Sequence, residues 1–266
     1  MTDKLSNAPI YYALAQARFN HVGAMHKYVD EVQDRLRKRG YVFFETQQST
    51  HLQMSAPMGN LVPEAQVNHV TMWAFTNVDR TAGYILGPSS ITFHTTHYKT
   101  KDEFIPELIL GIEAVHSVVS LGHIERLGIR YLDAVIPSQG EQVGQYLVDG
   151  VQGAKFNGNK QFGLSESVYF TETGPLIPNG TLVSRVYLAN SVLGLPGDLG
   201  VVNLEPMERF RPLAKLEHAI IDTDHYVEGM IPLRLDLIES QLRNMHQTSK
   251  EVFKINVTPH ALKAWA

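Results

Sequence analysis

One pattern in the sequence restricts the choice of fold more than any other. Strand-like segments lead into a long amphipathic helix, and this order occurs twice along the 266 residues. Residues 102–120 carry apolar side chains at a spacing of three to four, and residues 232–252 do the same. Each helical segment follows a stretch with the β-branched and aromatic enrichment of strands. The pattern predicts an α+β protein.

A short internal repeat accompanies this order. Residues 93–98 have the sequence Phe-His-Thr-Thr-His-Tyr, and residues 221–226, 128 positions later, have Ile-Asp-Thr-Asp-His-Tyr. The repeat favours two related halves, residues 1–137 and 138–266, each a mainly antiparallel sheet with one long amphipathic helix. Alternatively, the strand–helix unit is common in α+β proteins and the matching residues recur by chance. Two such halves would place a binding site in the cleft between them.

Further elements are predicted from alternation, composition and turn signals. Strands are predicted at residues 11–19, 41–45, 68–77, 83–86, 90–98, 124–136, 162–171, 181–189, 217–226 and 254–257. Two more helices are predicted at residues 24–39 and 259–265. The glycine-containing stretch 137–161 has little periodicity and is predicted to join the halves.

Composition excludes several classes of protein. With 23 Lys+Arg against 27 Asp+Glu and 44% apolar residues, the chain is neither a strongly basic nucleic-acid coat nor an acidic disordered tail. The absence of cysteine excludes disulfides, thiolate zinc sites and cysteine nucleophiles. No apolar run approaches the ~18–20 residues of a membrane span, and the first residues lack the apolar core of a signal peptide. We therefore expect a cytoplasmic protein with no membrane contact.

Two arginines on one predicted strand are candidates for anion binding. Alternation within residues 124–136 places Arg126 and Arg130 on one face, with Gly128 between them and apolar side chains opposite. Two guanidinium groups over a glycine can hold a carboxylate or a phosphate. The favoured alternative is that these arginines pair with carboxylates of the same chain, since buried arginines are usually satisfied internally. The candidate partners are Glu217, Asp222 and Asp224.

Asp222 and Asp224 are also the candidate metal ligands. Both project to one face of the predicted strand, where a pair of carboxylates can hold Mg²⁺ or Mn²⁺ together with water. The sequence identifies no third acidic ligand. The twelve histidines show no metal-binding spacing, because His94 and His97 would point to opposite faces of a strand. No cofactor is predicted, and the metal belongs only to an alternative function.

Nucleic-acid binding has two candidate features. A basic cluster ends the predicted helix 24–39, and its members are Arg35, Arg37, Lys38 and Arg39. These residues either contact nucleic acid or complement the helix dipole, and the second is favoured. Aromatic residues on successive strands either stack bases or form the inner face of a sheet, which is again favoured; they are Trp73, Phe75, Tyr84 and Phe93. No phosphate-binding loop, dinucleotide fingerprint or nucleophile elbow is present.

Short motifs along nearly the whole chain resemble a sporadically distributed family of conserved hypothetical prokaryotic proteins. The most specific motif is Arg126-Leu127-Gly128-Ile129-Arg130-Tyr131. The others are Ala8-Pro9-Ile10, Trp73-Ala74-Phe75, Tyr98 with its following helix, Asp222-Thr223-Asp224, the helix with Leu242 and His246, and the segment from Phe253 to Thr258. The chain departs from the family at Phe104, which only loosely meets an aromatic position, and at Asp133, which replaces an asparagine-like residue.

The resemblance implies no activity, but it does imply a setting. The patchy occurrence of the family resembles that of genes in mobile or defence loci, which implies an accessory protein that depends on partners. Since no catalytic residues are recognisable, we expect a non-enzymatic binding or assembly subunit, in a prokaryotic defence or toxin–antitoxin complex, with a protein partner or a second copy. One alternative is a metal-dependent enzyme for phosphorylated or nucleic-acid substrates, with Asp222 and Asp224 on the ion and Arg126 and Arg130 on phosphate. Another is a single-stranded nucleic-acid binding protein.

Overall fold

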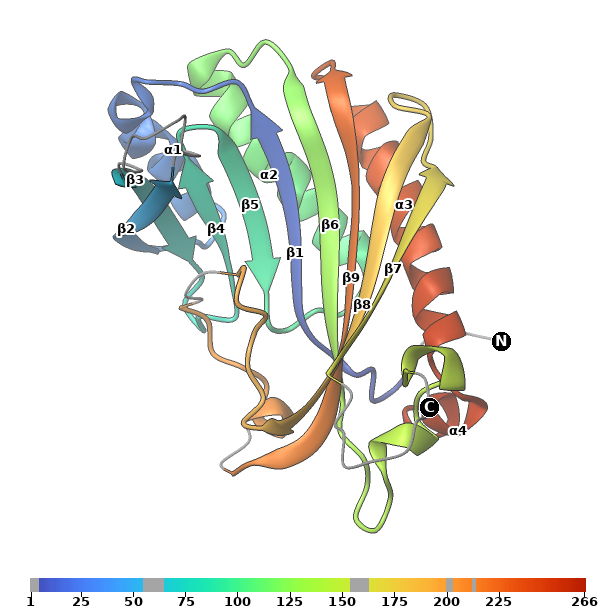
Figure 1. The fold of residues 1–266 in the computed structure, drawn as a ribbon. Coiled ribbons are helices and arrows are strands. Elements are labelled where there is room, and N and C mark those ends of the chain that lie inside the picture. The colour runs from blue at the N-terminus through green and yellow to red at the C-terminus, as the bar shows by residue number, and fades with distance from the viewer. Residues whose placement is uncertain (1–4, 55–64, 154–162, 200–202, 212–213) are drawn as a thin grey trace, which may run out of the picture.

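A computed structural model describes residues 5–54, 65–153, 163–199, 203–211 and 214–266 of the chain. In these residues, nine strands form one antiparallel sheet in the order β2-β3-β4-β5-β1-β6-β9-β8-β7 (Figure 1). The strands are β1 (Ile10–Phe19), β2 (Phe43–Met54), β3 (Ala65–Thr76), β4 (Ala82–Gly87), β5 (Ser90–Thr95), β6 (Ile124–Val135), β7 (Leu164–Glu172), β8 (Asn179–Ser191) and β9 (Leu216–Ile231).

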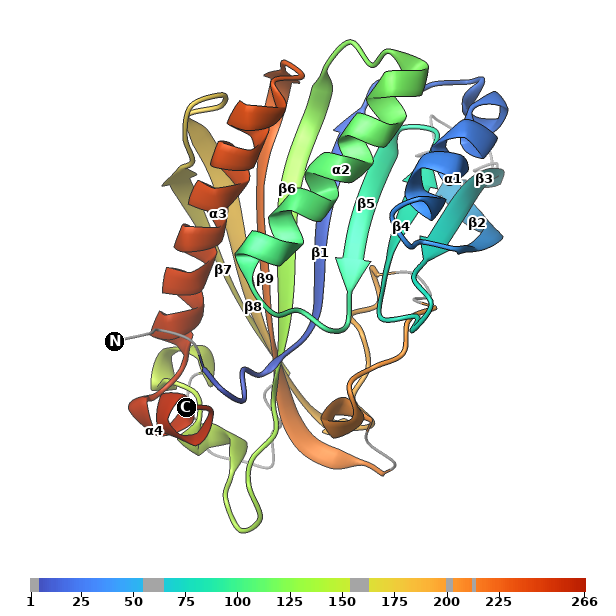
Figure 2. The same cartoon turned by 180° about the vertical axis from the view of Figure 1, so that it is seen from behind.

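Helices cover one face of the sheet, as Figure 2 shows from behind. The α-helices are α1 (Val29–Arg37), α2 (Lys101–Val119), α3 (Leu235–Asn256) and the short α4 (Pro259–Ala264). Short 3₁₀ helices lie at Met25–Lys27, Val143–Gln145, Asp149–Val151 and Glu208–Phe210. The apolar stripe of α2 packs on the inward side chains of β1, β5 and β6 in one continuous core. None of the described helices is long and apolar enough to cross a membrane.

The opposite face, here called the outer face, is covered only in part. The connection between β8 and β9 lies in front of its lower portion in Figure 1. Phe210 from this connection packs against Tyr11 of β1, with ring centroids 5.9 Å apart. Thr96 donates a hydrogen bond to the carbonyl of Glu205, which ties the same connection to the end of β5. The connection therefore has defined contacts with the sheet.

The α+β class and the antiparallel sheet are confirmed, whereas a separate sheet in each half is wrong. β6 pairs with β1 on one side and with β9 on the other, so the sheet is continuous. The reason is that both edges of β6 are free to pair, and burial of both faces favours a central position. The chain segments 1–137 and 138–266 thus contribute to the same sheet.

Two boundaries also differ from the predicted ones. The closing strand predicted at residues 254–257 is wrong, because α3 continues to Asn256 and only Val257 forms a bridge, with Leu147. β2 extends to Met54, well beyond the predicted end at residue 45. This extension consists mostly of polar residues and lacks the alternation of apolar and polar side chains that predicts a strand. Its strand conformation depends instead on pairing with β3. Residues 55–64 lie outside the described residues.

Candidate functional site

The predicted arginine pair lies on the outer face of the sheet, and Arg130 is saturated by carboxylates. Its Nε and Nη2 each donate to one oxygen of Asp222 at 2.7 Å. Its Nη1 and Nη2 donate to Asp198 at 2.6 and 3.1 Å. The favoured pairing with Asp222 is confirmed, and these bonds hold the pKa of Asp198 below its usual range. Arg130 therefore has two internal carboxylates where an external anion would have to bind.

Arg126 has internal partners as well. Its Nη2 lies 3.4 Å from Asp224, and its Nε lies 3.8 Å from Glu228. The guanidinium stacks over the ring of Tyr226 at 4.2 Å from the centroid. Since Glu228 is the register partner of Arg126, these contacts join β6 to β9 across the sheet. The two arginines are thus cross-strand pairing residues in this structure.

The candidate metal ligands share a face, as alternation predicted. Asp222 is completely buried and gives both oxygens to Arg130. Burial raises the pKa of Asp224, and Arg126 opposes that effect. Within the part of the chain that the structure describes, no three His, Asp or Glu side chains are grouped to hold a metal ion. A metal at this pair would have to replace Arg130 as the partner of Asp222.

The basic cluster Arg35, Arg37, Lys38 and Arg39 lies at the exposed end of α1, on the helix-covered side of the sheet. Lys38 pairs with Asp34 at 2.6 Å, and Arg37 donates to the carbonyl of Val42 at 3.2 Å. The aromatic residues proposed for base stacking, Trp73, Phe75, Tyr84 and Phe93, are buried in the core. They form the inner face of the sheet, as favoured, and are closed to nucleic acid.

A cavity of about 590 Å³ opens on the helix-covered side, and we call it the α2–α3 cavity. It lies where the first turn of α2 and the last turns of α3 face the sheet; Figure 2 shows these two helices side by side over the sheet. Residues 98–102, residues 246–254 of α3, the segment 5–10 and inward side chains of β6 and β9 line it. Cavities of this volume accommodate small organic molecules.

The inner end of the cavity contains two polar groups that have no hydrogen-bond or ion-pair partner in the described part of the chain. The carboxyl group of Asp133 is only 7% exposed and has no hydrogen bond or ion pair with any described residue. Burial raises its pKa to about 8. The hydroxyl of Thr223 on the neighbouring strand β9 is buried and likewise has no hydrogen-bond partner in the described residues. Such groups carry a desolvation cost, which is why they mark a candidate site.

A tyrosine–histidine pair lines the same cavity. The hydroxyl of Tyr131 lies 2.9 Å from Nδ1 of His246. Burial, with smaller contributions from Lys101 and Lys250, lowers the pKa of His246 to about 4. His246 is consequently neutral at pH 7.

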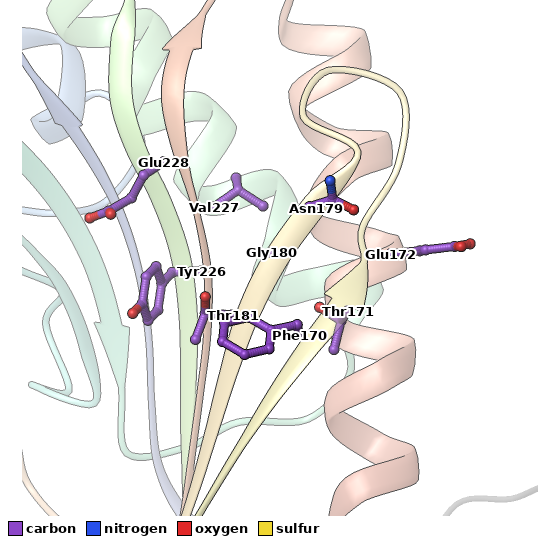
Figure 3. A pocket seen from close by; sticks show the side chains of 9 residues that line it. All are labelled: Phe170, Thr171, Glu172, Asn179, Gly180, Thr181, Tyr226, Val227 and Glu228. Carbon is purple, nitrogen blue, oxygen red and sulfur yellow. The ribbon is translucent and has the colours of Figure 1, made fainter.

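A second, shallow depression of about 310 Å³ lies on the outer face (Figure 3). Phe170 of β7, Thr181 of β8 and Tyr226 of β9 occupy adjacent register positions and form a row across the three strands. Phe170 is 88% exposed. It belongs to a set of alternate side chains on β7 that we call the β7 edge: Leu164, Glu166, Val168, Phe170 and Glu172.

Sequence reasoning missed the inner end of the cavity. One signal for Asp133 was available, because alternation along β6 places this acid on the apolar face with Leu127, Ile129 and Tyr131. Its proximity to Thr223 and His246 depends on strand register and helix docking, for which no local signal exists. Asp198 gave no signal either, since it lies in an irregular connection.

Comparisons with known proteins do not assign the site. No protein-family model matches the chain, and no curated protein has a matching sequence. The resemblance based on short motifs accordingly stays a prediction.

Proposed function

We propose that this protein is a non-enzymatic binding or assembly subunit that joins another protein chain through the β7 edge. The observation that carries the proposal is the exposure of Phe170, at 88%, beside the half-exposed Val168 and Leu164 on the same strand face. Burying one such phenylalanine against a partner is worth about 1.5–3 kcal/mol. Contiguous exposed apolar patches are typical of protein contacts, and these three side chains lie at alternate positions of one strand face.

The position of β7 at the end of the sheet supports the same proposal. In the described residues β7 pairs with β8 alone, so its other edge presents backbone N–H and C=O groups. A strand from a second chain can pair with these groups, and its side chains then contact Val168 and Phe170. Strand addition would thus use both the backbone and the apolar face of β7.

The occupant that we propose is a second copy of the chain. Antiparallel pairing of two β7 strands about Val168 places Glu166 of one protomer opposite Phe170 of its partner. The same register places Glu172 opposite Leu164 and Val168 opposite Val168, so no glutamate directly faces another. A two-fold contact of this type is closed, which prevents growth into fibres.

Light scattering coupled to size exclusion tests this proposal. We expect the wild-type chain to have twice its 29.8 kDa mass, and Phe170→Glu to have the mass of one chain. Val78→Glu, at an exposed apolar residue away from β7, is the matched control and should retain the wild-type mass. A wild-type monomer that brings no stable companion from its native host would overturn the proposal. If the wild type is a monomer that captures another protein through Phe170, the assembly role would stand, and only the proposal that a second copy occupies β7 would be overturned.

The two alternative functions have weaker support. A metal-dependent enzyme would need Asp222 to release Arg130, and a single-strand binding protein would depend on α1, because the predicted stacking residues are buried. The place of such a subunit in a defence or toxin–antitoxin complex comes from the family resemblance alone.

We also infer two related halves within the single sheet. β5 pairs with β1 and precedes α2, and β9 pairs with β6 and precedes α3. His94 and Asp222 are equivalent positions of the repeat, 128 residues apart. His94 lies opposite Leu14 of β1, and Asp222 lies opposite Leu132 of β6. A boundary ahead of β6, instead of after residue 137, would let each half begin with a central strand and end with a strand followed by a long helix.

A further inference from the structure

We propose that the α2–α3 cavity binds a mononucleotide, with the base held at the inner end by Asp133 and Thr223 and the phosphate beside Lys101 at the N-terminus of α2. This site lies on the opposite side of the sheet from the side chains of the β7 edge, and the inference does not depend on the proposed assembly. It rests on the volume and lining of the cavity, on two buried groups that have no partner among the described residues, and on Lys101 at the N-terminus of α2.

The inner end has unused hydrogen-bonding capacity. The side chains of Asp133 and Thr223 come from adjacent strands, and both line the cavity. Leaving a buried carboxyl and a buried hydroxyl without partners is unfavourable, and a bound molecule with polar edges would remove that cost. The inner end is therefore suited to a polar group of a ligand rather than to a hydrocarbon chain.

The protonation of Asp133 specifies the complementary group. Since burial raises its pKa to about 8, the carboxyl is mostly neutral at pH 7 and has an O–H donor beside a C=O acceptor. Every nucleobase has a donor and an acceptor side by side on its pairing edge. A neutral acid can thus form two hydrogen bonds with such an edge, and the Thr223 hydroxyl can add a third.

The mouth has the opposite character. Lys101 lies there together with Thr100, the N-terminal cap of α2, and Asp102, Lys250 and Lys254 are the other charged residues of this part of the lining. The helix N-terminus adds partial positive charge from its backbone N–H groups. Lys101 and Lys250 add to the lowering of the His246 pKa, and Asp102 opposes it. A phosphate is stabilised by this combination.

The walls between the two ends are apolar. Ile10, Pro9 and Phe253 line the cavity, and the ring of Tyr98 lies beside that of Tyr131 with centroids 5.5 Å apart. The volume of about 590 Å³ is within the range of small-molecule sites. An aromatic base between apolar walls completes the match.

Isothermal titration with the four ribonucleoside 5′-monophosphates tests the proposal, with nucleosides and inorganic phosphate as separate arms. We expect at least one nucleotide to bind, and Asp133→Leu and Thr223→Val each to weaken it about tenfold or more. Asp133→Asn retains a donor beside an acceptor and should bind within about threefold of wild type. Lys101→Ala should weaken the nucleotide but not its nucleoside, whereas Lys27→Ala, at an exposed lysine away from the cavity, should change neither.

Thermal melting without nucleotide separates lost binding from lost folding. Thr223→Val removes a hydroxyl that has no partner among the described residues, so it should melt at or above the wild-type temperature. The proposal is overturned if no nucleotide binds, if inorganic phosphate binds as tightly as the nucleotides, or if Asp133→Leu and Thr223→Val both bind as wild type does.

Discussion

At the scale of single residues, two buried aspartates illustrate how the partner decides the role of an acid. Asp222 is completely buried and lies within 2.7 Å of Arg130, which offsets the cost of burying its charge. Asp133, on the other face of the neighbouring strand, has no such cation and is protonated around neutral pH. One acid therefore joins strands, and the other is available to a ligand.

Asp133 makes folding stability depend on pH. Its pKa is about 8 in the folded chain and about 3.9 in the unfolded chain, so the folded state binds more protons between these values. The stabilisation is complete below pH 4 and is lost as pH rises through 8. Relative to Asp133→Asn, the wild type should lose on the order of 1–2 kcal/mol of unfolding free energy between pH 6.5 and 8. Urea unfolding across this range measures the difference.

Other groups near Asp133 do not obscure that window. Burial raises the pKa values of Tyr98 and Tyr131, and His246 is neutral above about pH 5. Lys101, Lys250 and Lys254, which also line the cavity, are shared by both proteins, so their contribution cancels in the comparison. Parallel pH profiles for the wild type and Asp133→Asn would contradict the assignment of a buried neutral acid.

At the scale of elements, α2 shows why a helix contains a glycine at a core position. The helix begins at Thr100, whose side chain accepts a hydrogen bond from the Glu103 N–H. It ends at Ser120, which has the left-handed conformation (φ 57°). Gly111 lies against the ring of Tyr84, and a Cβ at this position would be only 2.7 Å from it. The glycine allows the helix to approach the sheet closely.

Gly111→Ala should therefore destabilise the protein, although alanine is the better helix former. We expect a loss of about 1–3 kcal/mol from overpacking against Tyr84, which exceeds the gain of about 1 kcal/mol in helix propensity. Gly122→Ala is the control, because nothing lies within 4 Å of the added methyl group. Denaturant unfolding of both variants compares them, and equal stability would show that Tyr84 moves away without cost.

At the scale of the whole molecule, the continuous sheet joins the two parts of the chain. β6 lies between β1 and β9, with its inward side chains beneath α2 and α3. Separating the chain after residue 137 would leave β6 without β9 and would expose the edge of a central strand. Strand pairing of this kind makes the folding of both parts interdependent.

We expect one cooperative unfolding transition for the full chain. Circular dichroism and tyrosine or tryptophan fluorescence should give coincident urea curves, and residues 1–137 and 138–266 expressed separately should lack cooperative transitions. Two resolved transitions, or a separate segment that unfolds cooperatively, would show that the parts fold independently despite their common sheet.

The sequence by itself determined most of the local structure and one interaction of the outer face. Periodicity identified α2, α3 and the strand face that carries Arg126 and Arg130, because alternation and helical spacing are encoded residue by residue. It also favoured the pairing of Arg130 with Asp222, since buried charges need partners. Only the tertiary structure decided the order of nine strands in one sheet, the role of Asp198 and the meeting of Asp133, Thr223 and His246 in one cavity. These depend on strand register and helix docking, which are set by contacts between residues far apart in the chain.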